Sequence, residues 1–498
     1  MKQENQLHGS SLNLAPEQIK KICAEIVDYL SNKENPRYTQ KVRPKLTDRQ
    51  YSDLSTLERM PYHGSEAVST FEKYIHLLTT QAVSTSHPGF LAYIMGAASD
   101  VSVLADFLAA AISAPQTSAS TSHLTTMIEA QTIKWMCQLL GYPETGSGLF
   151  VSGGSVANLI ALQTAIKKKR TQNIVDLNQY RVYVSKYSHS SISSAVSISG
   201  LLPDQCIQYI ETTQEHTLSI SDLKTKIKHD QEHGYIPLMV IGIAGCTSLG
   251  VIDPLLALSD ICMKEDIWFH IDAAYGGFAV LSQEYSEALK GMQFSDSLTI
   301  DPHKWMYAAA DVGCILVKDP NILFNTFNQS GAYYSSDDLT FSNHLQFRDL
   351  GIQTTRSFRA LKVKLSLEIA GRIGYQQMIE KDIHLAKYAY RLALDHPNLE
   401  AYSCHLSIVT LRFNPNLTTD VKFISETNLN KINQEIIDDL HQLGDFFPSH
   451  TWVNNKYLIR LCIVNLNTTE DTIYGLLEAI DEVGKSKTCN YLTHMSTL

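Results

Sequence analysis

Short apolar runs alternate with helical patterns through the middle of this chain. Seven runs rich in β-branched and apolar residues predict strands at 148–151, 181–185, 206–211, 238–245, 267–273, 297–301 and 313–319. Nearly continuous apolar strands that are separated by helices are typical of a mainly parallel sheet covered on both faces. The pattern therefore predicts an α/β domain.

The amino-terminal region has a helical pattern instead. Residues 14–32 repeat apolar side chains at helical spacing, which predicts an amphipathic helix with Ile19, Ile22, Cys23, Ile26 and Leu30 on one face. Residues 31–60 are polar and contain two prolines, so we expect an extended arm that leads to a second helix within 66–84. An apolar helix face at the start of the chain indicates a packing partner elsewhere.

The carboxyl-terminal region predicts a smaller α+β domain. A long helical segment follows Arg356, strand-like runs cover 407–415 and 457–465, and Thr468 with Asp471 resembles the capping box of a final helix. We therefore divide the chain into a helical arm and dimerisation segment (1–95), a large α/β domain (96–375) and a small domain (376–498).

Composition and charge narrow the class of protein. The 498 residues are 44% hydrophobic and 18% charged, and no apolar run approaches the roughly 20 residues that cross a bilayer. The net charge of −10 opposes nucleic-acid binding, and the basic run Lys167–Arg170 is typical of a solvated helix end. The amino terminus shows no targeting signal, so we expect a cytoplasmic protein that binds neither nucleic acid nor membrane.

The cysteines do not indicate a metal site. The nine cysteines are scattered and contain no C-x-x-C pair, which argues against a disulfide framework and against zinc. We expect reduced thiols and no metal.

Chemically active side chains follow several of the predicted strands. In an open parallel sheet, ligands collect beyond the carboxyl ends of the strands. The residues found there are Gly153, Gly154, Ser155, His189, Thr247, Asp272, Ala273, Ala274, Asp301, His303 and Lys304. A glycine turn or a single histidine in such a place is more often structural, so the inference depends on the combination.

The combination predicts a site for pyridoxal 5'-phosphate. Backbone amides of a glycine-rich turn before a helix can bind the phosphate, and the Lys304 amine can capture the aldehyde as a Schiff base. The Asp272 carboxylate can hold the proton of the pyridine nitrogen, which makes the ring an electron sink. His189 and Ala274 can supply a stacking contact and a small close contact to the two faces of the ring.

The motifs carry a resemblance to a known family. "SGGSVANLIAL", the histidine in "HSS", "HIDAAYGGF", "DPHKW" and "HPGFLAYI" together resemble the group II pyridoxal-phosphate-dependent amino-acid decarboxylases, from about Arg59 to the last helix. This family includes enzymes that act on aromatic L-amino acids, glutamate and diaminobutyrate. The resemblance implies fold type I, a homodimer with active sites at the subunit interface, and an amino-terminal helical segment packed on the partner.

The resemblance also implies roles for single residues. Lys304 would bind the cofactor covalently, Asp272 would contact the pyridine nitrogen, and His189 would stack on the ring near the substrate carboxylate. The other expected cofactor contacts are Gly154, Ser155 and His303 near the phosphate and Thr247 near the ring substituents. Asp301 stands where asparagine is common in the animal enzymes, and we assign it no phosphate contact because a carboxylate repels phosphate. The basic residue that often follows "HSS" is absent.

Reaction type and substrate depend on three further segments. Tyr333 matches the family's loop tyrosine, which is thought to protonate the carbon that loses CO2; Tyr334 is adjacent and leaves a one-residue ambiguity. Relatives with phenylalanine there resemble oxidative aldehyde synthases. Tyr93 and Ile94 resemble the side-chain pocket of the aromatic enzymes, and Arg460 could bind the substrate carboxylate or form an ordinary ion pair.

We therefore expect a decarboxylase that converts an L-amino acid, favouring an aromatic one, to its amine. The alternatives are a decarboxylase of a polar amino acid such as glutamate or diaminobutyrate, or a fold type I aldehyde synthase or aminotransferase. A non-catalytic scaffold is a further alternative, but such a protein would be expected to lack the lysine, aspartate or loop tyrosine.

Overall fold

A seven-stranded sheet forms the centre of the large domain. The computed structural model describes residues 12–32, 36–44, 60, 62–113, 116–117, 119, 122–172, 176–328, 346–418 and 424–496. The strand order is β2-β8-β7-β6-β5-β3-β4, and only β8 runs antiparallel to its neighbours. The bounds are β2 Ser147–Val151, β3 Tyr180–Ser185, β4 Ile207–Ile210, β5 Ile236–Ile243, β6 Trp268–Asp272, β7 Ser297–Ile300 and β8 Gly313–Val317. All seven predicted strands are confirmed to within a few residues.

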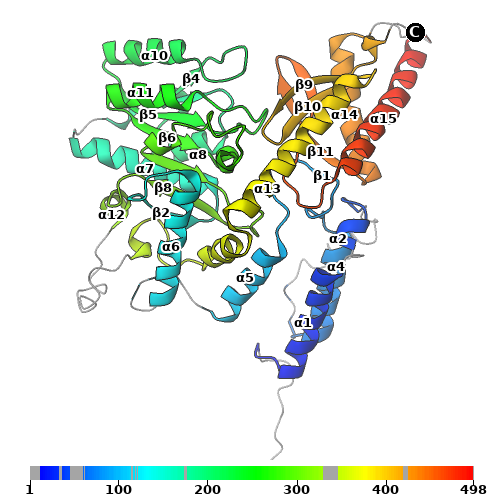
Figure 1. The fold of residues 1–498 in the computed structure, drawn as a ribbon, viewed down its shortest axis with the longest axis horizontal. Coiled ribbons are helices and arrows are strands. Elements are labelled where there is room, and N and C mark those ends of the chain that lie inside the picture. The colour runs from blue at the N-terminus through cyan, green and yellow to red at the C-terminus, as the bar shows by residue number, and fades with distance from the viewer. Residues whose placement is uncertain are drawn as a thin grey trace, which may run out of the picture.

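Helices cover both faces of this sheet, as predicted (Figure 1). On β6, His270 and Asp272 face α7 (Gly154–Gln172), because both side chains form hydrogen bonds with Asn158 of that helix. Gly242 of β5 faces α11 (Leu255–Glu265) instead, where an added Cβ would lie 2.9 Å from Leu255 Cδ2. The remaining helices of this domain are α5 Asp100–Ala111, α6 His123–Leu140, α8 Ser191–Ile198, α9 Pro203–Cys206, α10 Ile220–Glu232 and α12 Ile322–Phe327.

The carboxyl-terminal region forms a second sheet of five strands. Its order is β1-β11-β12-β10-β9, with β1 Phe90–Leu91, β9 Leu399–His405, β10 Ile408–Phe413, β11 Phe447–Val453 and β12 Lys456–Cys462. The long helix α13 (Arg359–Asp395) bends at Gly371 and joins the two sheets, while α14 (Glu426–Leu443) and α15 (Glu470–Ser496) pack on the second. The predicted α+β character is confirmed, and Phe90–Leu91 joins this sheet from the amino-terminal side.

The predicted cap of the final helix is wrong by one residue. Thr469 Oγ1 accepts a hydrogen bond from the Thr472 N–H at 3.3 Å, and the Thr469 N–H donates to Thr472 Oγ1 at 3.4 Å. Thr468 instead donates to the Pro88 carbonyl at 2.8 Å. A bond to a residue 380 positions away is invisible to a local capping rule.

The amino-terminal helices extend away from the two sheets (Figure 1). Helices α1 (Pro16–Ser31) and α4 (Ala67–Gln81) pack together through an ion pair of 2.7 Å between Lys21 and Glu72, and α2 (Pro36–Thr39) lies beside α4. Of the predicted apolar face of α1, Ile22 is buried, whereas Ile19 is 48% exposed. In the part of the chain that the structure describes, much of this face is therefore left uncovered.

Among the helices described, none is long and apolar enough to cross a membrane. The basic run ends α7 with mostly exposed side chains, and Lys169 pairs with Asp266 at 3.1 Å.

Candidate active site

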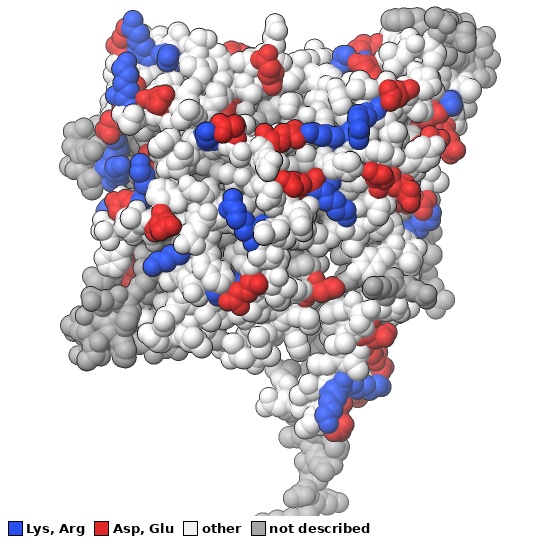
Figure 2. Space-filling view, viewed as in Figure 1, with Lys and Arg blue, Asp and Glu red and all other residues white. Residues whose placement is uncertain are grey.

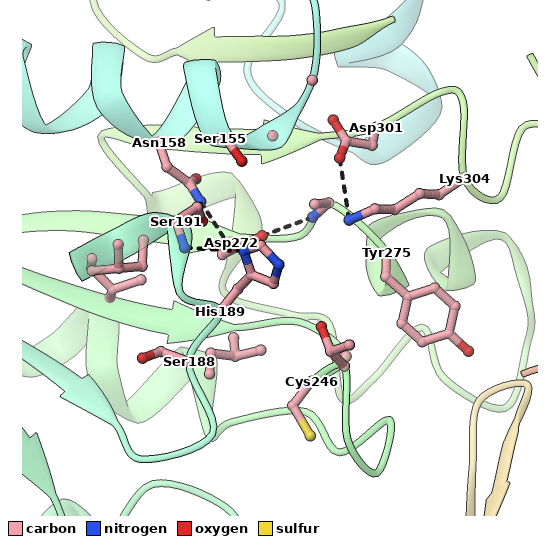
Figure 3. Close-up of a pocket in the computed structure, with 18 of the residues that line it drawn as sticks. Ser155, Asn158, Ser188, His189, Ser191, Cys246, Asp272, Tyr275, Asp301 and Lys304 are labelled. Carbon is pink, nitrogen blue, oxygen red and sulfur yellow. Dashed lines mark hydrogen bonds and ion pairs between the residues drawn. The ribbon is translucent and has the colours of Figure 1, made fainter. Parts of the chain in front are cut away.

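The ends of five strands meet around one cavity of about 400 Å³. It lies beyond the carboxyl ends of β2, β3, β5, β6 and β7, at the edge where the parallel strands point the same way. Figure 3 shows the Lys304 side chain extending toward Asp272 and His189. The structure brings together the predicted cofactor residues Gly154, Ser155, His189, Thr247, Asp272, Ala274, His303 and Lys304.

Asp272 ends β6 and is held by two N–H donors. Asn158 Nδ2 of α7 donates to Asp272 Oδ2 at 3.0 Å, and the Ala274 backbone N–H donates to Asp272 Oδ1 at 3.2 Å. The same Nδ2 donates to Ser191 Oγ at 3.0 Å. These contacts fix the direction in which the carboxylate faces the cavity (Figure 3).

A buried network behind Asp272 sets the orientation of the Asn158 amide. Its Oδ1 accepts from His270 Nε2 at 3.0 Å and from Thr299 Oγ1 at 2.7 Å, so its Nδ2 must face Asp272. Burial lowers the pKa of His270 to about 4, so the imidazole is neutral near pH 7 and carries its proton on Nε2. Asn158 was not predicted as a site residue; its only signal was an amide in an otherwise apolar stretch of helix.

Lys304 lies on the turn after β7 and forms an ion pair within the cavity. Its Nζ is 3.2 Å from Asp301 Oδ2, and the Asp301 side chain is only 3% exposed. His303 Nδ1 donates to the Val312 carbonyl at 2.6 Å, which leaves His303 Nε2 3.8 Å from the same Asp301 oxygen. The sequence predicts no phosphate contact for Asp301, and the structure gives it an ion pair with the Lys304 amine.

The glycine turn between β2 and α7 leaves little room for side chains at Gly153 and Gly154. An added Cβ at Gly154 would lie 2.9 Å from Asp301 Oδ2 and 3.3 Å from Ala274 Cβ, and one at Gly153 would lie 3.3 Å from His303 Cε1. The turn leads directly into the first residues of α7, whose N–H groups have no carbonyl partner within the helix. A phosphate would fit this backbone cradle and the positive end of the helix.

His189 follows β3 and presents an imidazole to the cavity. The Ser191 backbone N–H donates to His189 Nδ1 at 3.2 Å, so Nδ1 is an acceptor and Nε2 is the ring nitrogen that can donate to a ligand. The side chain is exposed, as expected for a group that contacts a ligand.

A second cavity of about 510 Å³ adjoins the first and contains the predicted substrate residues. Tyr93, Ile94 and Arg460 line it, and it shares His189, Thr247 and Lys304 with the cofactor cavity. A substrate bound there would therefore reach the Lys304 amine.

Among the described residues, Arg460 donates to carbonyl and hydroxyl oxygens and not to a carboxylate, so the structure gives it contacts other than the ordinary ion pair. Its Nε donates to the Thr247 carbonyl at 2.7 Å and its Nη1 to the Tyr93 carbonyl at 2.9 Å. Its Nη2 is buried and has no hydrogen-bond partner among the described residues. The guanidinium thus ties together two segments of the cavity wall. Tyr333 and Tyr334 lie outside the described residues.

The residues around the cavity fit the chemical groups of pyridoxal phosphate. A lysine amine for the aldehyde, a held carboxylate for the ring nitrogen and a glycine cradle for the phosphate surround one cavity at the strand ends. The fold and this set of groups define a pyridoxal-phosphate-dependent enzyme of fold type I.

Comparison with known proteins identifies the family. Residues 55–413 match the pyridoxal-dependent decarboxylase conserved domain. The chain is 32% identical to an aromatic-L-amino-acid decarboxylase of Bacillus atrophaeus, over 97% of this chain and 99% of that one. It is also 26% identical to a phenylacetaldehyde synthase of Petunia hybrida, over 88% of each chain. A crystal structure of Oryza sativa TDC with PLP and tryptamine superposes with a TM-score of 0.89 at 22% identity, over 96% of this chain and all of that one.

The chain therefore belongs to the pyridoxal-dependent decarboxylase family. It is a carboxy-lyase of amino-acid metabolism that uses pyridoxal phosphate to decarboxylate an amino acid. The expected fold, cofactor and reaction class are confirmed.

Proposed function

We propose that the protein converts an aromatic L-amino acid to the corresponding amine and CO2 in the cytoplasm. The observation that carries this proposal is the second cavity, where Tyr93 and Ile94 adjoin Lys304. Its volume of about 510 Å³ is sufficient for an aromatic side chain, and Ile94, Ile437 and Tyr457 offer it apolar contacts beside the polar residues of the wall. The Bacillus atrophaeus relative, named for aromatic L-amino acids, supports the same substrate class.

The residues of the first cavity would hold the cofactor. Lys304 would bind its aldehyde carbon, Asp272 its ring nitrogen, and the cradle of Gly154 and Ser155 its phosphate. When bound, pyridoxal phosphate supplies an electron sink for the bond that breaks. Asn158 supports Asp272 in this role, because its Nδ2 donates to the carboxylate at 3.0 Å.

His303 and Thr247 complete the proposed cofactor contacts. His303 lines the cavity beside the glycine turn, within 3.3 Å of the position that a Gly153 Cβ would occupy, and is assigned to the phosphate. Thr247 lines both cavities and is assigned to the ring substituents. Ala274, only 6% exposed, leaves room for the ring while closing the space beside it.

The substrate side is assigned to residues that face both cavities. His189 can donate from Nε2 to the substrate carboxylate, and Arg460 adds positive charge to the wall of the second cavity. Decarboxylation breaks the bond between Cα and the carboxylate carbon, and a proton then replaces CO2 at Cα. We assign delivery of that proton to Tyr333, with Tyr334 as the neighbouring candidate.

We also propose that the protein is a homodimer. Large apolar side chains are exposed on three packed helices, which is unusual for a surface that faces water. They are Leu104, Phe107 and Leu108 of α5, Leu124 and Met127 of α6, and Ile369 and Ile373 of α13. The surface over α5 is also largely free of charged side chains (Figure 2). A second copy of the chain would cover this face and that of α1.

The test is to identify products by mass spectrometry. The purified, cofactor-loaded protein is incubated in air with L-tyrosine, L-tryptophan, L-phenylalanine, L-glutamate or L-2,4-diaminobutyrate. We expect amines from the aromatic substrates and none from Lys304→Ala. Lys318→Ala is the matched control, because Lys318 is an exposed lysine at the opposite edge of the sheet.

Each other product would change a different part of the proposal. An amine only from glutamate or diaminobutyrate would overturn the assignment of Tyr93 and Ile94. Aldehyde in place of amine, the kind of product for which the phenylacetaldehyde synthase relative is named, would overturn the role of Tyr333. Turnover by Lys304→Ala at the wild-type rate would overturn the role of Lys304.

A further inference from the structure

Asp382 is a buried carboxylate on α13 that the proposed chemistry does not use. Its side chain is 1% exposed. One oxygen, Oδ2, accepts hydrogen bonds from Trp305 Nε1 at 2.9 Å and from Tyr307 Oη at 2.6 Å. The other oxygen, Oδ1, is buried and has no partner among the described residues. Both hydrogen bonds that Asp382 accepts from the described residues therefore come from side chains of one turn.

That turn is the one that carries Lys304. Trp305 follows the lysine directly, and the Tyr307 backbone N–H donates to the Lys304 carbonyl at 3.3 Å. Tyr307 has a φ of +54°, a left-handed conformation that aromatic residues rarely adopt. The hydroxyl of this tyrosine donates to Asp382, so a residue 75 positions away contacts the turn.

Trp305 connects the same carboxylate to the wall of the cofactor cavity. Its indole stacks on the Tyr275 ring with centroids 5.0 Å apart and planes 20° from parallel. Tyr275 lines the cavity, and its hydroxyl lies 2.6 Å from Ser407 Oγ of the carboxyl-terminal region. Asp382, Trp305 and Tyr275 thus form a continuous support behind the site.

We propose that Asp382 is a positioning residue that holds the 304–307 turn, through Trp305 and Tyr307, so that the Lys304 amine reaches the cofactor. This inference rests on the proposed role of Lys304 as the cofactor-binding lysine. Asp382 does not touch the cavity itself and acts only through the turn.

The surroundings of Asp382 favour a hydrogen-bond acceptor rather than an ion pair. Lys381, the neighbouring cation, donates to the Leu466 carbonyl at 2.9 Å and not to Asp382. Burial raises the pKa of Asp382 to about 7, against the two hydrogen bonds and the charge of Lys381, which lower it. The other ionisable groups nearby are Tyr307 and Cys462, whose pKa values burial raises.

The test measures how fast Lys304 captures the cofactor. Pyridoxal phosphate is added to cofactor-free protein, the amine condenses with the aldehyde and releases water, and borohydride then reduces the C=N bond. Peptide mass spectrometry counts the label on Lys304 over time. Asp382→Leu removes the acceptor at similar volume, whereas Asp382→Asn keeps one oxygen that can accept both bonds.

We expect Asp382→Leu to slow labelling of Lys304 by about tenfold or more, because both donors lose a buried acceptor. Asp382→Asn should stay within about threefold of wild type, since its oxygen can still accept from both donors. Leu385→Ala is the matched control: Leu385 is on the same helix, 3% exposed, but packs into the apolar core of the carboxyl-terminal region. It should lower stability and leave labelling unchanged. Circular dichroism confirms that each variant is folded at the temperature used.

Three results would overturn the inference. Labelling of Asp382→Leu at the wild-type rate would show that the turn does not need the carboxylate. An equal loss in Leu385→Ala would show that the effect is one of general stability. If Asp382→Leu does not fold, the Trp305→Phe and Tyr307→Phe variants each remove one donor, and wild-type labelling in both would contradict the proposal. Label on a different lysine in the wild-type protein would instead overturn the role of Lys304.

Discussion

At the scale of single residues, Asn158 decides how the site is assembled. Its oxygen accepts from His270 and Thr299, so its nitrogen is left to donate to Asp272. The Asn158 amide therefore links this buried polar network to Asp272 and fixes the direction of its carboxylate. A buried network of this kind tolerates loss of a member poorly, because the remaining polar groups stay unpaired.

We predict that Asn158→Leu weakens cofactor binding by roughly tenfold to a hundredfold, because a buried hydrogen bond to a charged group contributes about 1.5–3 kcal/mol. Fluorescence titration of the cofactor-free protein measures the dissociation constant. Gln163→Leu is the control on the same helix, since Gln163 donates to Ser199 at 2.6 Å outside the cavity. Equal affinities for Asn158→Leu and wild type would show that Asp272 needs no support.

Asp382 makes a second prediction at this scale, on pH and stability. Because its pKa is raised from 3.8 to about 7, the folded protein binds its proton more tightly than the unfolded chain does. This group therefore makes folding less favourable as the pH rises from about 4 to 7, by about 4 kcal/mol in all. Asp382→Asn cannot titrate, so it lacks this contribution.

The midpoint of urea denaturation measures the effect between pH 5 and 8. We expect the midpoint of Asp382→Asn to rise relative to that of wild type as the pH increases. A difference between the two proteins that is the same at every pH would mean that Asp382 keeps one charge state throughout this range.

At the scale of elements, the parallel strands were readable from the sequence because burial on both faces makes them continuously apolar. β11 was not, since Phe447–Val453 contains a proline and several polar residues and alternates between buried and exposed positions. β9 is mostly half-buried and gives a similarly weak pattern. Neither strand can be recognised without the neighbours that cover it.

The same limit applies to the site. Residues at strand ends were predictable because the topology of a parallel sheet brings those ends together. Asn158 meets Asp272 across 114 positions and Asp382 meets Trp305 across 77, and no local pattern reports such pairs. The contact of Asp301 with Lys304 was also hidden, although the two are three residues apart, because it depends on the direction of both side chains.

The segment between β1 and α5 gives a prediction about backbone packing. An added Cβ at Gly96 would lie 2.1 Å from the Lys304 carbonyl oxygen and 3.1 Å from that of His303. Backbone atoms cannot move aside as a flexible side chain can, so we expect Gly96→Ala to displace the turn that carries Lys304. The expected result is a loss of cofactor binding of tenfold or more, on the order of the cost of overpacking a core, measured by the visible absorbance of the bound cofactor.

Gly475→Ala is the control for this substitution. Gly475 lies in α15, where an added Cβ would meet Phe446 Cζ at an ordinary 3.4 Å. Alanine in a helix is more favourable than glycine by about 1 kcal/mol, so this variant should be as stable as wild type or more so. Full cofactor binding by Gly96→Ala would show that the turn can shift without loss of function.

At the scale of the whole molecule, the exposed apolar face of α5, α6 and α13 predicts the oligomeric state. Scattered exposed apolar residues are ordinary on a protein surface, but Phe107, 59% exposed, and Ile373, 71% exposed, lie on helices that pack together. A stable interface buries about 1,600 Å² of surface in total. Helices α1 and α4 extend from the body and offer further apolar area to a partner.

We predict that wild type sediments as a dimer of twice the 55.7 kDa chain mass, and that Phe107→Glu shifts it to the monomer. A charge at the centre of an apolar interface stays unpaired there, whereas in the monomer it faces water at no cost to the fold.

Met263→Glu is the matched control, because Met263 is 81% exposed on α11, at the other end of the large domain. Analytical ultracentrifugation distinguishes the two masses. Because the family resemblance implies active sites at the subunit interface, we expect the monomeric variant to lose turnover as well. A Phe107→Glu dimer with full activity would place the interface on another face of the molecule.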